Sequence, residues 1–245
     1  MRNTIKRTRS ISCMIAVFAV GISNQLAMAD EGVVRAKISY GMANYSSPSS
    51  YGTISSNYST LGLGVTYIFP SNIFADLTMK TSGSDASYNA NSVTSGLVSS
   101  DQKFVRNENI ITIGMPLDNG MQGNAGIFTA DTVFKLAQFG QFSQKMTGIT
   151  AGIGKGFPIN QGMSGTVGVN GAGALLNATN TDRFGNSSGS DLSYGLSAGA
   201  AYNYMFNKNF GFSADAKFQS YFIKYSSFSG DEKILSLALS LIGQF

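Results

Sequence analysis

Residues 234–245 read I-L-S-L-A-L-S-L-I-G-Q-F, and this alternation decides the fold. Leu235, Leu237, Leu239 and Leu241 occupy every second position, and Phe245 extends the same row. A β-strand directs successive side chains to opposite faces, so one face of this segment is rich in leucine and the other is small and mostly polar. In a soluble sheet the leucine face would pack against a core. In a membrane barrel the leucine face would meet lipid, and the polar face would line the lumen.

The first 29 residues predict a secretory signal peptide. Basic residues at positions 2, 6, 7 and 9 precede an apolar run over 11–21, and Ala27 and Ala29 form a small-residue cleavage site. The apolar run is shorter than the roughly 20 residues that a membrane-spanning helix needs. We therefore expect cleavage before Asp30, which divides the chain into a signal peptide (1–29) and one barrel domain (30–245).

The net charge of the chain resides in this signal peptide. Four of the 17 basic residues and none of the 13 acidic ones lie there, so the mature chain is formally neutral and gives no support to nucleic-acid binding. Cys13, the one cysteine, is removed with the signal peptide, and the sequence has no histidine. These absences exclude disulfides, His-dependent catalysis and ordinary zinc or copper sites, so we expect no metal and no cofactor.

Ten segments of the mature chain alternate with a period of two. Short connections follow the second, fourth, sixth and eighth segments, and mostly longer ones follow the odd segments. This arrangement is typical of an outer-membrane barrel with both chain ends in the periplasm. The sequence therefore predicts an all-β, transmembrane, antiparallel up-and-down barrel of ten strands, with eight or twelve as alternatives and a secreted soluble β-sandwich as the competing fold. The segments are 34–42, 60–69, 73–79, 104–117, 121–137, 147–157, 163–175, 192–206, 210–222 and 234–245.

The apolar row of each segment predicts which face meets lipid. The rows are clearest in segments 192–206 and 210–222, where tyrosine, phenylalanine, leucine and alanine alternate with serine, glycine and charged residues. In segment 121–137 the same reasoning directs Phe128, Ala130 and Phe134 to lipid. Asp131 and Lys135 would then project into the lumen.

The signal peptide, the alternation and the closing strand that ends on phenylalanine resemble the small bacterial outer-membrane β-barrel proteins of the OmpA/opacity-like group. The resemblance implies insertion by the barrel-insertion machinery through the last strand, with Leu237, Leu239, Leu241 and Phe245 as its signal, and contact with outer-membrane lipid and lipopolysaccharide. Small barrels also include ten-stranded surface proteases and lipid-modifying acyl hydrolases. Because those enzymes rely on histidine, we expect no enzymatic activity here.

Charged residues on the polar faces are the candidate functional residues of the lumen. One hypothesis is that these long side chains reach into space left by glycines on other strands and pair into a network that fills a narrow interior, because unpaired buried charges are costly. The alternative is a charge-lined, water-filled pathway for small solutes. The residues are Arg35, Lys37, Asp76, Lys80, Arg106, Glu108, Asp131, Lys135, Asp215 and Lys217.

Three polar segments, at about 45–57, 81–103 and 177–191, are expected to form outer loops. They are rich in serine, asparagine, glycine and tyrosine and are nearly uncharged. They are either solvated connections or a contact surface for a host or cell-surface ligand, since functional contacts tend to lie on loops that a rigid scaffold presents. The sequence thus predicts a structural or adhesin-like protein, with a narrow porin-like channel as the alternative.

Overall fold

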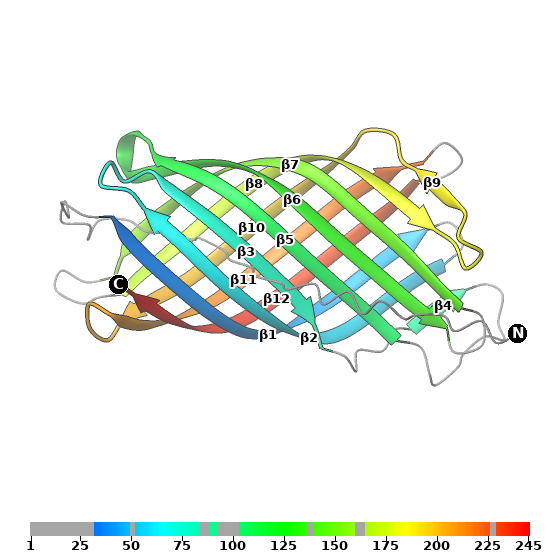
Figure 1. Ribbon diagram of the computed structural model, residues 1–245, viewed down its shortest axis with the longest axis horizontal. Coiled ribbons are helices and arrows are strands. Elements are labelled where there is room, and N and C mark those ends of the chain that lie inside the picture. The colour runs from blue at the N-terminus through cyan, green and yellow to red at the C-terminus, as the bar shows by residue number, and fades with distance from the viewer. Residues whose placement is uncertain are drawn as a thin grey trace, which may run out of the picture.

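Ten long antiparallel strands close into one barrel (Figure 1). The computed structural model describes residues 32–49, 52–83, 89–92, 103–136, 140–159, 165–225 and 229–245. The strand order is β1-β12-β11-β10-β8-β7-β6-β5-β3-β2, and β2 pairs with β1 to close the ring. The predicted fold class and the predicted ten strands are confirmed. The long strands are β1 (Val33–Ser49), β2 (Gly52–Ile68), β3 (Phe74–Ser82), β5 (Lys103–Pro116), β6 (Met121–Leu136), β7 (Gly140–Pro158), β8 (Gly165–Thr181), β10 (Ser193–Met205), β11 (Phe210–Lys224) and β12 (Ser229–Gln244).

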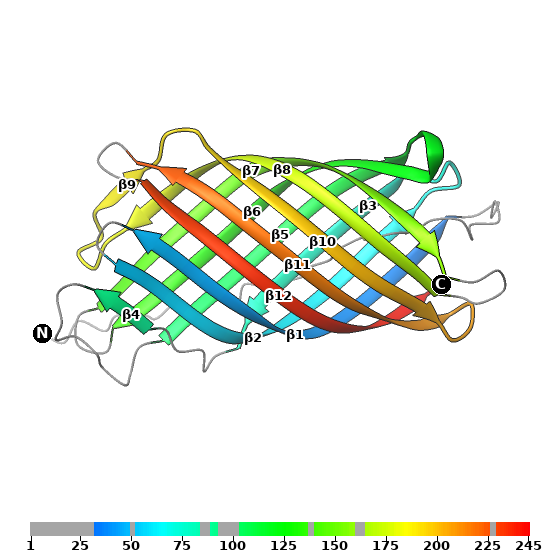
Figure 2. The same cartoon turned by 180° about the vertical axis from the view of Figure 1, so that it is seen from behind.

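The first and last strands form the seam of the barrel. Strand β12 pairs with β1 from Arg35 opposite Gln244 to Ser46 opposite Lys233. The backbone N–H of Phe245 donates to the Val34 carbonyl at 2.9 Å, and the Val34 N–H donates back to the Phe245 carbonyl at 3.0 Å. Seen from behind, β1 and β12 run side by side along the barrel (Figure 2). No strand edge is left open at the seam, which removes the aggregation hazard of an open sheet.

The leucine row of β12 lies on the outside of the barrel. Leu239 is 66% exposed, whereas its neighbour Ser240 is 5% exposed and faces the interior. We call the exposed apolar side chains on the outside of the barrel the belt. Soluble proteins rarely expose contiguous apolar patches of more than a few hundred Å², so the belt is a lipid-facing surface and not an aqueous one. The described residues contain no helix long and apolar enough to cross a membrane. The belt includes Ile38, Tyr40, Met42, Leu61, Leu63, Val65, Ile111, Ile113, Ile127, Ile149, Ile153, Leu175, Tyr194, Leu196, Phe218, Leu235, Leu237, Leu239 and Leu241.

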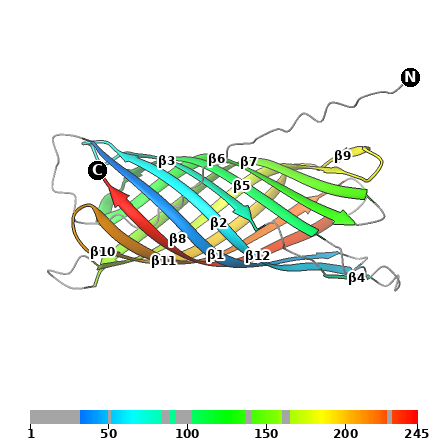
Figure 3. The same ribbon diagram turned by 60° about the horizontal axis from the view of Figure 1, so that its bottom comes forward.

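The two ends of the barrel differ. At the end that carries the C-terminus every connection is short, including the turn after β2 and the 3-10 turn η1 (Asp118–Gly120). The opposite end has both short connections, such as that between β1 and β2, and long ones, between β3 and β5 and between β8 and β10. The opposite end carries two short extra strands, β4 (Asn89–Ser92), which pairs with β2, and β9 (Ser187–Gly189), which pairs with β8 (Figure 3). We call the C-terminal end the inner end and the opposite one the outer end.

The orientation predicted for segment 121–137 is wrong. Phe128, Ala130 and Phe134 on β6 are buried inside the barrel, and Asp131 and Lys135 therefore lie on its outer surface. The physical reason is that both faces of β6 carry apolar residues. Ile127 faces lipid, while the two phenylalanines pack against other aromatic rings in the interior.

Much of what the structure describes of the predicted outer loops is paired strand. Residues 45–49 and 52–57 belong to the outer part of the β1–β2 hairpin, which is paired up to Ser49 opposite Gly52. Residues 177–191 contain the end of β8, a turn and β9. Of residues 81–103, the structure describes 81–83, strand β4 and Lys103. Except for β3, which has 9 residues, the long strands have 13 to 19 residues and exceed the 9–11 that a tilted strand needs to cross the hydrocarbon layer. The barrel wall therefore continues beyond the membrane at the outer end, where polar residues such as Asn44, Asn57 and Lys145 face outward.

Single-cysteine labelling tests the corrected orientation of β6, because Cys13 is the one cysteine in the sequence. In the folded mature chain, cysteine at Asp131 (Asp131→Cys) is expected to react nearly completely with a membrane-impermeant maleimide. Cysteine at Ala130 (Ala130→Cys) is expected to stay protected, because that position is buried inside the wall. Both variants should react after unfolding in urea, which controls for intrinsic reactivity. The reverse pattern in the folded state would contradict the orientation.

Candidate functional site: the barrel interior and its outer end

A layer of fully buried side chains closes the barrel towards its outer end. We call Tyr45, Phe104, Met146, Leu176, Ile223 and Ile234 the closing layer; they come from β1, β5, β7, β8, β11 and β12 and belong to one contact cluster. Phe104 and Met146 are 0% exposed, and the other four are 1% exposed. A water-filled pore would leave the lumen side of such residues accessible to water. Tyr58 on β2, Phe134 on β6 and Ser193 on β10 are buried as well, so the closure extends around the ring.

Aromatic rings occupy the centre of the closing layer. The ring centroid of Phe104 lies 5.1 Å from that of Tyr45, 4.9 Å from that of Tyr58 and 5.5 Å from that of Phe134. These separations fall within the range of favourable tilted and edge-to-face contacts. The aromatic residues on the inner face of β1, β2, β5 and β6 therefore act as packing for the interior, which explains why an apolar row alone misplaced β6.

Arg106 forms ion pairs and hydrogen bonds with residues of other strands inside this packed region. Its Nε donates to Glu108 Oε1 at 2.9 Å, and its Nη1 donates to Thr132 Oγ1 at 2.6 Å and to Glu232 Oε2 at 3.0 Å. The Tyr45 hydroxyl donates to the other Glu232 oxygen at 3.1 Å. Arg106 is 2% exposed and Glu232 1%. Because β5 and β12 are not neighbours in the sheet, the ion pair between Arg106 and Glu232 spans the lumen.

The structure brings some of the predicted lumen charges together. Besides Arg106 and Glu108, Lys37 Nζ donates to Asp215 Oδ2 at 2.8 Å. Asp76 accepts from the hydroxyls of Thr66 at 2.8 Å and Thr78 at 3.2 Å instead of pairing with a base. Arg35 Nη2 donates to Gln244 Oε1 at 2.6 Å.

The remaining predicted lumen residues divide into two groups. Lys80 and Lys217 line a cavity in the middle of the barrel. Asp131 and Lys135 lie outside the lumen, for the reason given above. Ala27 and Ala29 of the predicted cleavage site lie outside the described residues.

Glu232 is the residue that sequence reasoning missed. It lies just before the segment 234–245 that was expected to form the closing strand, but β12 begins at Ser229, so the inward row of Ile234 and Ser236 extends back to Glu232. Extending the alternation by one step would have identified it. The described residues contain no group of three or more carboxylate, histidine or cysteine side chains that could hold a metal ion.

The turn between β8 and β9 presents an exposed aromatic residue at the outer end. Asp182 Oδ1 accepts from the backbone N–H groups of Phe184 at 2.8 Å and Asn186 at 2.9 Å, and Oδ2 accepts from Asn186 Nδ2 at 3.0 Å. The hydrogen bond from the Asn186 side chain lowers the pKa of Asp182. The Arg183 guanidinium carbon lies 4.5 Å from the Phe184 ring centroid, and Phe184 is 73% exposed. The turn is therefore ordered around its own side chain and displays a cation–π pair to solvent.

The similarity to solved structures lies in the barrel architecture. The outer membrane protease OmpT of Escherichia coli matches with a TM-score of 0.57 at 9% identity, covering 87% of this chain and 97% of that chain. The fold is that of an outer-membrane β-barrel. Neisserial surface protein A matches with a TM-score of 0.41 at 14% identity, and Ail, the attachment invasion locus protein of Yersinia pestis, with 0.33 at 15%. The match to Neisserial surface protein A covers 87% of this chain and 97% of that chain, and the match to Ail covers 88% of this chain and 99% of that chain. No protein-family model and no curated protein matches the sequence.

Proposed function

We propose that the mature chain is an integral protein of the bacterial outer membrane that conducts no solutes, catalyses no reaction and acts at the cell surface through its outer end. In this proposal the chain is exported by its signal peptide, which is cleaved before Asp30. It is then inserted by the barrel machinery through its closing strand and held in a bilayer of lipid and lipopolysaccharide. The observation that carries the proposal is the closing layer, because a transport role requires a path for water that these buried side chains block.

The paired charges support a closed interior over a porin-like channel. Selective pores place charged groups where ions in water can reach them. Here Arg106 and Glu232 are buried from water and paired with each other, and Arg106 also pairs with Glu108 and Glu232 with the Tyr45 hydroxyl. Charged groups arranged in this way stabilise one packing of the interior instead of lining a pathway.

The Phe184 turn supports a contact role at the cell surface. Exposed aromatic and arginine side chains are enriched at the energetic centres of protein interfaces. Phe184 and Arg183 lie together on a turn that Asp182 already orders, so binding would cost little additional ordering of the backbone. The partner in this proposal is a host or neighbouring-cell surface molecule that offers an apolar or aromatic patch.

Adhesion measurements test the contact role. Cells that display the protein are expected to bind to cultured epithelial cells or to one another, and the double variant Arg183→Ala/Phe184→Ala should lose about tenfold or more in binding, as the loss of about 1.4 kcal/mol or more at a hot spot implies. Ser188→Ala is the matched control, because this residue is exposed on β9 of the same hairpin. Equal adhesion by the wild type and the double variant, at equal surface display, would remove the contact role.

A further inference from the structure

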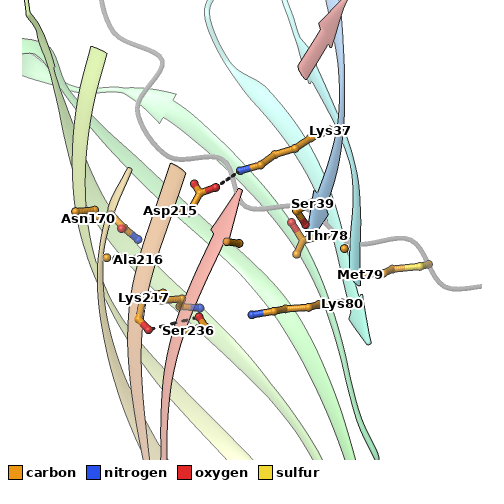
Figure 4. A pocket seen from close by; sticks show the side chains of 14 residues that line it. Lys37, Ser39, Thr78, Met79, Lys80, Asn170, Asp215, Ala216, Lys217 and Ser236 are labelled. Carbon is orange, nitrogen blue, oxygen red and sulfur yellow. Dashed lines mark hydrogen bonds and ion pairs between the residues drawn. The ribbon is translucent and has the colours of Figure 1, made fainter. Parts of the chain in front are cut away.

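Basic side chains gather on one part of the outer surface, outward of the belt on β5 to β8. Elsewhere in the barrel basic side chains lie close to carboxylates. In the lumen Lys37 Nζ donates to Asp215 Oδ2 at 2.8 Å (Figure 4), and at the outer end of β11 Lys224 Nζ lies 3.9 Å from Asp191 Oδ2. The outer surface of β5 to β8 differs, because its basic residues outnumber its acidic ones. We call it the cationic face; its basic residues are Lys103, Lys135, Lys145 and, on the turn after β8, Arg183.

The acidic residues on this side leave most of the positive charge unbalanced. Asp131 on β6 lies opposite Lys145 on β7, and the carboxylate of Asp182 is bound within its own turn. Lys103 and Lys135 lie directly opposite each other on β5 and β6, and both are exposed. Like charges in this arrangement destabilise a sheet. In the described part of the chain, no carboxylate oxygen lies within 4.0 Å of either ammonium nitrogen.

Arg183 extends this lysine pair across β7. Gln141 on β7 lies opposite Lys135, and a Cβ atom on the neighbouring Gly140 would lie 3.4 Å from Arg183 Cβ. Cations from β5, from β6 and from the turn after β8 therefore lie side by side near the outer rim. An anionic group from outside the chain would relieve their repulsion.

The surface between the belt and these cations changes character row by row, because directly opposite residues form continuous rows across β5 to β8. The last row of the belt is aliphatic, and the next row outward carries neutral side chains that form hydrogen bonds. Lys145 lies in the row after that, and the lysine pair lies two rows further out. The aliphatic row is Ile111, Ile127, Ile149 and Leu175, and the neutral row is Asn109, Thr129, Thr147 and Asn177.

The tilt of the strands sets the depth of each cation in the membrane. With a rise of about 3.3 Å per residue and a tilt of about 40°, Lys145 lies about 10 Å outward of Ile149, and Lys135 lies about 20 Å outward of Ile127. Lys145 is thus at the depth of the lipid headgroups, whereas the lysine pair is further from the hydrocarbon. Lipopolysaccharide carries phosphate groups at both depths, on the sugars that bear its acyl chains and on the sugars of its core.

We propose that the cationic face binds lipopolysaccharide of the surrounding outer leaflet. The aliphatic row contacts the acyl chains, and the neutral row forms hydrogen bonds with the acylated sugars. Lys145 binds a phosphate on those sugars, and Lys103 and Lys135 bind a phosphate of the core. The inference rests on the proposed placement of the barrel in the outer membrane, and it does not depend on the contact role of the Phe184 turn.

Binding of fluorescently labelled rough lipopolysaccharide with a phosphorylated core tests the cationic face. Fluorescence anisotropy measures its dissociation constant for the refolded mature chain in a non-ionic detergent at constant ionic strength. Lys103→Gln/Lys135→Gln is expected to weaken binding about 30-fold and Lys145→Gln about fivefold, which corresponds to about 1 kcal/mol for each lysine beside an anionic membrane surface. The three side chains are exposed, so the variants should retain the circular dichroism of the barrel.

Lys224→Gln/Lys233→Gln is the matched control, because it removes the same charge from the outer surface of β11 and β12. This variant should bind lipopolysaccharide as the wild type does. Equal affinity of the wild type and Lys103→Gln/Lys135→Gln, or an equal loss in the control, would overturn the proposal. All these variants retain Arg183 and Phe184, so the outcome is separate from that of the adhesion measurement.

Two further probes distinguish lipopolysaccharide from a soluble polyanion. Lipopolysaccharide dephosphorylated with hydrofluoric acid should bind the wild type at least 30-fold more weakly than the intact form. Heparin in solution reaches the lysine pair but not the headgroup depth, so in barrels inserted in lipid vesicles Lys145→Gln should weaken binding of lipopolysaccharide and leave binding of heparin unchanged. Loss of heparin binding in Lys103→Gln/Lys135→Gln with unchanged binding of lipopolysaccharide would assign the face to a soluble partner and overturn the proposal.

Discussion

Replacement of Arg106 by methionine is expected to lower the free energy of unfolding by about 3–5 kcal/mol, the cost of leaving a buried charge without its partner. The variant would leave Glu108 and Glu232 buried in the outer half of the lumen with no guanidinium between them. Methionine retains much of the length and apolar volume of arginine, so the loss would report the charge more than the packing. Urea unfolding of the refolded barrel in lipid vesicles measures the change.

Neutralising the two carboxylates at the same time separates this effect from a general packing defect. The triple variant Arg106→Met/Glu108→Gln/Glu232→Gln should recover most of the lost stability, because no buried charge then lacks a counter-charge. A loss of under about 1 kcal/mol in Arg106→Met would place this cluster in the range of solvent-exposed ion pairs and contradict its burial.

A positive charge on the leucine row of β12 is expected to have the second large effect. Leu239→Arg should destabilise the barrel in vesicles by about 2–4 kcal/mol, the cost of an arginine on the lipid face near the bilayer midplane. Leu239 lies between Tyr40 and Ala214 in the sheet and is exposed to the exterior, so its replacement alters contact with lipid and not the lumen.

Asn44→Arg provides the matched control for Leu239→Arg. Asn44 also faces outward, but it lies on the polar outer part of β1, where the cost should fall to about 0–1 kcal/mol. Equal effects of the two substitutions would show that the leucine row does not face the hydrocarbon.

The lipid-facing surface was largely predictable from the sequence. In β10, β11 and β12 the apolar residues fall on one face and small or charged residues on the other, and the structure places Leu196, Phe218 and Leu239 outside as expected. The prediction for β6 was wrong because hydrophobicity identifies a residue that avoids water, but it does not show whether that residue enters the lipid or the packed interior of the barrel. Phe128 and Phe134 avoid water inside the lumen, and Ile127 avoids it in the lipid.

The pairing inside the lumen was less predictable. Alternation assigns a residue to the inner face, and this sufficed to place Lys37, Arg106 and Asp215 inside. It does not give the height of a residue along the barrel, which depends on strand tilt and register. That geometry brings Arg106 on β5 to Glu232 on β12, two residues 126 positions apart, and leaves Asp76 with threonine hydroxyls instead of a base.

The closing layer and the cavity divide the interior into two parts with different chemistry. Towards the outer end, aromatic rings and the Arg106 cluster exclude water. Towards the inner end, the inward side chains on β6, β8 and β10 are small or neutral. A barrel built in this way presents a sealed outer end to the cell exterior, which suits a contact surface more than a passage.

Current recording across planar lipid bilayers tests the closed lumen most directly. The mature chain is refolded and its insertion is verified by β-sheet circular dichroism and by protection from protease. The closing layer then predicts a baseline current without steady single-channel steps. Reproducible steps of constant amplitude from the wild-type protein would contradict a closed barrel.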